Sequence, residues 1–107
     1  FSWHGTQLGR PDWGSSSHSI ALSAELKKER MLLHFIFNAY WEPLEFELAP
    51  TDGSGAWHRW IDTALESPQD IVPWREAPKI PGSPYRAESR SVVVLFAPLS
   101  GANIRDW

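Results

Sequence analysis

Acidic side chains close to tryptophan or proline are the first candidates for chemistry in this sequence. Hydrolysis of a glycosidic bond needs two carboxyl groups held about 5 to 10 Å apart across the bond. The candidate acids are Asp12, Glu42, Asp62 and Asp70. The sequence contains no Gly-x-Ser-x-Gly motif, no phosphate-binding glycine loop and no Cys/His pair that would add a second catalytic element. Since every protein of this size has such isolated acids, we expect no catalytic centre in this chain.

Tryptophan is the unusual feature of the composition, with seven among 107 residues. An indole ring supplies a large apolar face, which can stack on a sugar ring, close the end of a small β-domain, or contact a neighbouring domain. We favour the structural uses and keep sugar binding as an alternative. The candidates for carbohydrate binding or a domain interface are Trp3, Trp13, Trp57 and Trp74, which lie in expected loops or at expected strand ends.

The histidines show no pattern typical of a metal site. His4, His18, His34 and His58 are scattered through the sequence, without a His-x-x-x-His pair or a comparable spacing. The absence of cysteine removes thiolate ligands and disulfide bonds. We therefore expect neither a metal ion nor another cofactor.

Charge and hydropathy exclude two classes of partner. The formal net charge is -3, and the one basic cluster is short, Lys27-Lys28-Glu29-Arg30. Nucleic-acid binding usually needs a concentrated basic face, so we expect no nucleic-acid partner. No run approaches the roughly 20 apolar residues that span a bilayer, so we expect no membrane insertion. A chain without cysteine is compatible with a reducing compartment, and we expect a cytoplasmic protein.

The hydrophobic pattern predicts strands rather than helices. Residues 31–38 and 90–96 are apolar on both faces and rich in phenylalanine or valine, as in buried central strands. Alternating segments at 20–24, 44–48 and 57–62 predict half-buried strands. Such short strands, separated by turns, favour an all-β fold, an antiparallel β-sandwich with Greek-key-like connections.

Three segments between the expected strands need a choice of conformation. Residues 24–31 include good helix formers, but we favour a charged hairpin turn there. Residues 51–55 are rich in glycine and predict a loop. The proline-rich stretch 68–84 predicts a loop or an extended segment that covers a sheet edge, with a polyproline ligand within 78–84 as the less favoured alternative.

The chain has the length of one domain, which we place at residues 1–97, followed by a tail at 98–107. It begins with Phe1 instead of Met and has no leader-like segment, which leads us to expect a piece cut from a longer polypeptide. Within it, Asn38 follows an apolar strand and is expected to tie its amide to the turning backbone.

Several blocks of this sequence resemble the C-terminal domain of bacterial glycogen debranching enzymes, the isoamylase-like members of the α-amylase superfamily. They occur in the family's order across about Phe1 to Phe96, and the block at 38–44 is the most specific. The blocks are Trp3-His4-Gly5, Gly9-Arg10-Pro11-Asp12-Trp13, Ser17-His18-Ser19-Ile20-Ala21, Asn38-Ala39-Tyr40-Trp41-Glu42-Pro43-Leu44, Trp60-Ile61-Asp62-Thr63, Ser67-Pro68-Gln69-Asp70-Ile71, Tyr85 and Arg90-Ser91-Val92-Val93-Val94-Leu95.

The resemblance implies an antiparallel β-sandwich packed on a catalytic (β/α) barrel of the same polypeptide. That barrel would hydrolyse α-1,6 branch linkages in glycogen or limit dextrin with retention of configuration. None of the family's catalytic motifs occurs here, so the resemblance implies no catalytic residue in this chain. The expected function is that of a non-catalytic accessory domain, which stabilises or shields the barrel.

Two further expectations concern partners. The alternative function is an autonomous carbohydrate-binding module, which would present coplanar exposed indoles to an α-glucan. A domain separated from its barrel would also expose an apolar former interface, and such a surface favours self-association.

Overall fold

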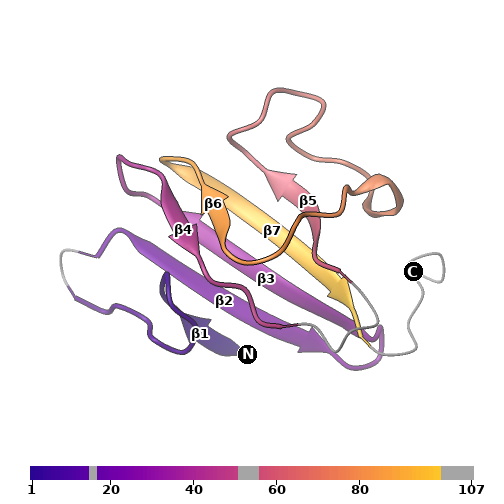
Figure 1. Cartoon of the computed structure of the whole chain (residues 1–107), viewed down its shortest axis with the longest axis horizontal. Helices are drawn as coiled ribbons and strands as arrows, with labels where there is room; N and C mark the ends of the chain where they lie inside the picture. Colours follow the sequence, from indigo (N-terminus) through magenta and orange to yellow (C-terminus); the bar gives the residue numbers. More distant parts are fainter. Residues whose placement is uncertain (15–16, 51–55, 100–107) are drawn as a thin grey trace.

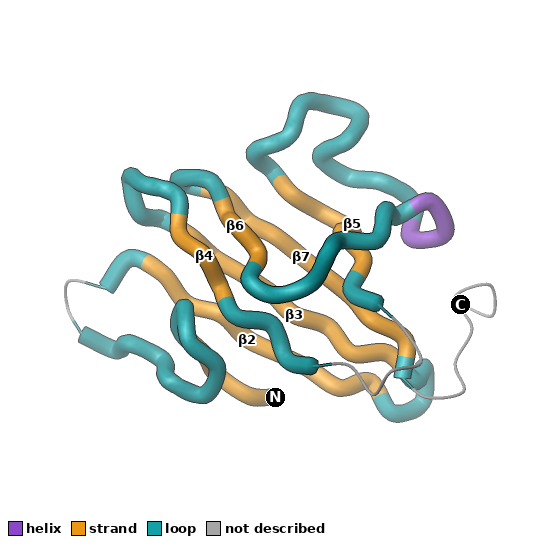
Figure 2. The backbone as a smooth tube through the Cα atoms, viewed as in Figure 1, coloured by secondary structure: helices purple, strands orange, loops and turns teal. Residues whose placement is uncertain are grey.

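Seven β-strands and one short 3-10 turn form this computed structural model, which describes residues 1–14, 17–50 and 56–99 (Figures 1 and 2). The described residues contain no α-helix, which confirms the all-β prediction. The elements are β1 (Ser2–His4), β2 (Ser19–Leu26), β3 (Met31–Asn38), β4 (Leu44–Phe46), β5 (His58–Asp62), the turn η1 (Trp74–Glu76), β6 (Tyr85–Ala87) and β7 (Ser91–Pro98).

The strands form two antiparallel sheets in two layers. The larger sheet has the order β1-β2-β3-β7-β5, and the smaller sheet pairs β4 with β6. Figure 1 shows β4 and β6 lying across one face of the larger sheet, over β2, β3 and β7. The strands predicted as central are adjacent in the larger sheet, with all eight residues of β3 paired to β7. These layers confirm the expected sandwich.

The main core lies between the two sheets. The smaller sheet contributes Phe46 and Ala87, both fully buried, to this core. They pack with side chains from the inner face of the larger sheet. Burial of such side chains is the principal stabilisation available to a domain without disulfide bonds. The larger sheet contributes Ala21, Ile36, Val93, Leu95 and Ala97.

The outer face of the larger sheet carries a second, smaller core at one end. Phe96, Leu33, Met31 and Ala24 lie there, and Ala77 from the segment after η1 packs against them. The half-buried Trp60 and Val72 join the same cluster. The other end of this face has no comparable cover among the described residues.

The proline-rich segment covers the free edge of β5. The backbone nitrogens of Asp62 and Arg59 donate hydrogen bonds to the carbonyl oxygens of Asp70 and Pro78, at 2.9 and 3.0 Å. Ile71 and Lys79 form isolated bridges with Ile61 and His58. These contacts confirm the extended, edge-covering alternative and satisfy backbone groups that an edge strand would otherwise leave unpaired.

The hairpin between β2 and β3 settles the choice between helix and turn in favour of the turn. Leu26 pairs with Met31, and the backbone nitrogen of Arg30 donates to the carbonyl oxygen of Lys27 at 3.3 Å. Arg30 has a φ of 57°, in the left-handed region that a tight turn often requires.

The last strand of the larger sheet reaches the start of the expected tail. β7 continues to Pro98, which pairs with Met31, one residue into the expected tail 98–107. Residues 100–107 of that tail and the glycine-rich loop 51–55 lie outside the described residues. Sequence reasoning missed β1 and β6, each of three residues.

Tyr85 links the two sheets through a partly buried hydrogen bond. Its hydroxyl, on β6, donates to Oδ2 of Asp62 at the end of β5, and Asp62 is 4% exposed. Oδ1 of Asp62 accepts from the backbone nitrogen of Ala64 at 3.1 Å. Burial raises the pKa of Tyr85, and the hydrogen bond to Asp62 raises it further.

We expect Tyr85→Phe to lower the free energy of unfolding by about 1–3 kcal/mol, because it leaves a buried carboxylate oxygen without its donor. Urea unfolding followed by tryptophan fluorescence measures the change. Tyr40→Phe is the matched control, because its hydroxyl has no hydrogen bond within the described part of the chain. Equal stability of the two variants would contradict this role.

Candidate functional site

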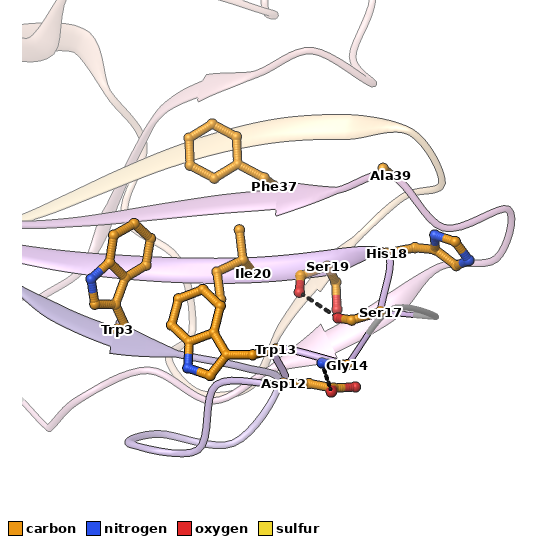
Figure 3. Close-up of a pocket in the computed structure, with 10 residues that line it drawn as sticks. All are labelled: Trp3, Asp12, Trp13, Gly14, Ser17, His18, Ser19, Ile20, Phe37 and Ala39. Atoms are coloured by element: carbon orange, nitrogen blue, oxygen red, sulfur yellow. Dashed lines mark hydrogen bonds between the residues drawn. The ribbon is translucent and has the colours of Figure 1, made fainter.

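Two of the four tryptophans selected from the sequence meet at one edge of the larger sheet. Trp3 lies on β1 and Trp13 on the loop that follows it, with ring centroids 5.5 Å apart and planes inclined by 70°. Trp3 is 48% exposed and Trp13 is 67% exposed. Figure 3 shows the two rings near each other, with the ring of Trp13 next to Ile20 of β2. They form an aromatic corner open to solvent.

The loop that carries Trp13 is fixed by His4 at its base. Nδ1 of His4 accepts a hydrogen bond from the backbone nitrogen of Gly9 at 2.7 Å, and Nε2 lies 2.9 Å from Oγ of Ser23 on β2. Because Nδ1 accepts, the proton resides on Nε2, which donates to the serine. A Cβ atom at Gly5 would lie 2.5 Å from the carbonyl oxygen of Arg10, so the loop requires glycine there.

A surface cavity of about 450 Å³ opens beside the aromatic corner (Figure 3). Trp3, Trp13, Ile20 and Phe37 supply its apolar side, while Asp12 is the one charged side chain among the lining residues. Oδ1 of Asp12 accepts from the backbone nitrogen of Gly14 at 2.9 Å, which fixes the carboxylate. Serine and histidine side chains complete the polar side. Such a cavity suits a ligand with both an apolar face and hydrogen-bonding groups.

A second cavity borders the same residues 17–19. This second cavity, of about 350 Å³, shares Asp12, Ser17 and His18 with the first and adds Arg10 and Tyr40. His18 stacks on Tyr40 with centroids 6.0 Å apart and planes inclined by 17°. The two cavities therefore border one polar ridge.

The outer face of the larger sheet is apolar and largely open next to this corner. The strand register aligns Trp3, Leu22 and Phe35 in one row across β1, β2 and β3. The next row on the same face joins Ile20 and Phe37 to Val92 of β7. Phe37 is 41% exposed and Val92 is 36% exposed. We call this set the outer apolar face: Trp3, Ile20, Leu22, Phe35, Phe37 and Val92.

The structure corrects the expectation for Trp57. This residue is 4% exposed and belongs to the core between the sheets. Its Nε1 donates to the carbonyl oxygen of Ala49 at 2.8 Å, and its ring meets His34 edge-on. Trp57 is a core residue because its neighbours bury both faces of the indole, which leaves no face for a sugar or another domain.

Trp74 lies away from the aromatic corner. It sits on η1, 37% exposed, with its ring 5.8 Å from that of Trp60 on β5. Strands β5 and β1 form opposite edges of the larger sheet, so the structure does not bring Trp74 together with Trp3 and Trp13.

Phe37 and Trp41 are among the exposed aromatic residues that sequence reasoning missed. Phe37 was included in a strand expected to be buried on both sides, although the absence of polar alternation in 31–38 is equally consistent with an apolar face that a partner covers. Trp41 is 65% exposed and lies 5.6 Å from the ring of Tyr40. Its position before Glu42-Pro43 in a turn was the available signal.

Three of the candidate acids, Asp62, Asp70 and Glu42, take part in hydrogen bonds that hold the fold together. Asp62 is buried and binds Tyr85, and the backbone oxygen of Asp70 pairs with the backbone nitrogen of Asp62. Glu42 contributes its backbone oxygen to the amide of Asn38. Across residues 1–14, 17–50 and 56–99, no group of three or more acidic, histidine or cysteine side chains is placed to hold a metal ion. The same ranges include no helix long and apolar enough to cross a membrane.

The two antiparallel layers define an all-β domain of the sandwich class. A family model described as "Isoamylase 1-3, C-terminal" matches residues 2–95. The chain therefore belongs to the family of isoamylase C-terminal domains, as its sequence blocks indicated. No match was found among the curated proteins.

Proposed function

We propose that this chain is the accessory domain of an isoamylase-type debranching enzyme and that it docks on the enzyme's catalytic barrel through the outer apolar face. The observation that carries the proposal is the uncovered apolar half of the outer face of the larger sheet. In the proposed parent enzyme, the barrel hydrolyses α-1,6 linkages in glycogen or limit dextrin, and the present domain stabilises or shields it.

The composition of the outer apolar face supports a protein partner. Its rows contain aromatic and branched aliphatic side chains and no charged residue. Large exposed apolar patches on soluble proteins usually mark interaction sites, and the centres of interfaces are enriched in aromatic residues and depleted of charge. A protein surface of matching apolar character fits this face better than solvent does.

The family and the topology support the barrel of the same polypeptide as the partner. The matching family is the C-terminal part of isoamylases, so in such an enzyme the preceding chain enters this domain at β1. Strand β1 carries Trp3 and borders the outer apolar face. A domain attached there is held close to the face, which favours contact within one polypeptide over contact between separate molecules.

The test uses a full-length isoamylase that ends in this domain. Phe37→Glu and Val92→Glu place charges in the proposed interface, and we expect each to lower the midpoint of thermal unfolding of the barrel by roughly 5 °C. Differential scanning calorimetry should show separate transitions for the barrel and the domain. Ile71→Glu is the matched control, because Ile71 is also apolar, is 60% exposed and lies outside the face.

Two results would overturn the docking proposal. One is a barrel transition that responds to Phe37→Glu no more than to Ile71→Glu. The other is a full-length enzyme that forms dimers, which Phe37→Glu dissociates into monomers whose barrel transition is unchanged. That result would assign the outer apolar face to contact between two copies.

A further inference from the structure

We propose that the aromatic corner formed by Trp3 and Trp13, together with Asp12, binds the sugar rings of an α-glucan chain. In addition to docking on the barrel, the domain would then bind a ligand. Only the choice of an α-glucan among neutral sugars rests on the proposed function. The ring geometry, the polar groups and the charge of the cavity each favour a sugar.

The ring geometry provides a flat surface and an adjoining wall. Trp13 is 67% exposed although it is one of the largest apolar side chains, and the plane of Trp3 stands at 70° to it. A pyranose ring has an apolar face of C–H groups and a polar rim of hydroxyl groups. Laid on Trp13, such a ring would remove apolar area of both partners from water and meet Trp3 with its edge.

Asp12 supplies a fixed acceptor at the rim of the same cavity. The backbone nitrogen of Gly14 binds Oδ1 at 2.9 Å, and within the described residues no second hydrogen bond engages this side chain. Figure 3 shows the carboxylate beside Gly14, close to the base of Trp13. Oδ2 is therefore available for a hydroxyl group, and a preorganised acceptor costs little ordering on binding.

The charge of the cavity favours a neutral ligand. Asp12 is the one charged group among the lining residues, so an anionic ligand such as a phosphate would be repelled. Ser17, His18 and Ser19 add neutral polar groups. A neutral polyol matches this set better than an anion or a purely apolar molecule.

The adjoining cavity favours a chain over a single sugar. It shares Asp12, Ser17 and His18 with the first cavity and leads toward Tyr40, on which His18 stacks. A glucan that contacts Trp13 can therefore continue across the polar ridge. The cavity shares Trp3, Ile20 and Phe37 with the outer apolar face, which would place the glucan at the edge of the proposed domain interface, a frequent location for ligand sites.

The test titrates the 107-residue chain with maltoheptaose, followed by isothermal calorimetry and by the NMR signals of the indole N–H groups. We expect saturable binding with a Kd on the order of 1 mM, and the indole signals of Trp13 and Trp3 should shift most. Trp13→Ala should weaken binding by about tenfold or more, and Asp12→Ala by about threefold to tenfold. Trp74→Ala is the matched control, an exposed tryptophan at the opposite sheet edge, and should leave the affinity unchanged.

Circular dichroism of each variant verifies that it folds, and Asp12→Asn provides a second variant that retains an acceptor for Gly14. Lack of saturation by maltoheptaose would overturn the site, as would binding that Trp74→Ala weakens and Trp13→Ala does not. Equal affinity for cellohexaose would overturn the α-glucan assignment. None of these results alters the calorimetric test of docking, so the two proposals fail independently.

Discussion

Replacement of Asn38 by aspartate is expected to lower the free energy of unfolding by about 3–5 kcal/mol at pH 7.5. Asn38 is 1% exposed, and its Nδ2 faces three carbonyl oxygens, those of Glu42, Ala87 and Glu88, at 3.1 to 3.2 Å. Oδ1 accepts from the backbone nitrogen of Tyr40 at 3.0 Å. This amide joins the end of β3 to the turn before β4 and to the end of β6.

Aspartate retains the acceptor but removes both donor hydrogens, so its carboxylate would face those three carbonyl oxygens in a buried position. The folded state would then favour the protonated carboxyl group, which raises its pKa relative to the unfolded chain. A carboxyl pKa that is raised in the folded state costs stability increasingly as the pH rises from the unfolded pKa to the folded pKa, so part of the difference in stability between Asn38→Asp and the original chain should disappear as the pH falls toward 5.

Urea unfolding at pH 7.5 and pH 5 tests this expectation. Gln69→Glu is the matched control, because it also exchanges an amide for an acid but lies at an exposed loop position. The loss of unfolding free energy in Asn38→Ala should lie between the losses in Asn38→Asp and Gln69→Glu, at about 2 kcal/mol, since alanine removes the donor without introducing a charge. A loss in Asn38→Asp no larger than in the control would contradict the assigned role of this amide.

The role of Asn38 could be predicted from sequence because it depends on local order. An amide that directly follows an apolar strand has turning backbone within reach, and the structure confirms that contact with Glu42 and Tyr40. The bonds to Ala87 and Glu88 could not be predicted, since they join segments about fifty residues apart. Sequence patterns describe neighbours along the chain and leave such distant contacts undetermined.

The same limit explains which strands could be predicted from the sequence. The long strands β2, β3 and β7 have enough apolar or alternating residues for a recognisable pattern. Strands β1 and β6 have three residues each, too few for a period of two to show. They exist because β2 and β4 offer them backbone partners, which is a tertiary effect.

For the candidate site, composition identified aromatic residues but could not determine their exposure. Trp13 and Trp57 both have small or flexible residues nearby in the sequence, yet Trp13 is 67% exposed and Trp57 is 4% exposed. The difference arises because Trp57 lies between the two sheets, whereas Trp13 follows an edge strand. Phe37 and Trp41 were missed for the same reason, because exposure depends on which layers cover a residue.

Acidification from pH 7.5 to pH 5 is expected to lower the free energy of unfolding through His34. This side chain is fully buried on β3, where its ring stacks on that of His4 at 5.6 Å and meets that of Trp57 edge-on at 5.9 Å. Within the described residues, neither ring nitrogen has a hydrogen-bond partner. Burial, together with the smaller effect of the nearby His4, lowers the pKa of His34 from 6.5 to about 4.

The direction of the effect follows from proton uptake. Between pH 6.5 and pH 4, the unfolded chain binds a proton at His34 and the folded chain does not. The contribution of His34 to the free energy of unfolding is therefore complete above about pH 6.5 and declines as the pH falls toward 4. At pH 5 the loss amounts to about 2 kcal/mol. Burial lowers the pKa of His4 as well, which adds a contribution of the same sign.

His34→Leu should remove most of this pH dependence, because leucine is apolar and does not titrate. At pH 7.5 its stability should stay within about 1 kcal/mol of the original, since an apolar side chain replaces a ring with no hydrogen bonds. The measurement is urea unfolding from pH 7.5 to pH 5, with His18→Gln as the control at an exposed histidine. If His34→Leu retained the full pH dependence, the acid sensitivity would reside in other groups, with His4, which contacts His34 directly, as the next candidate.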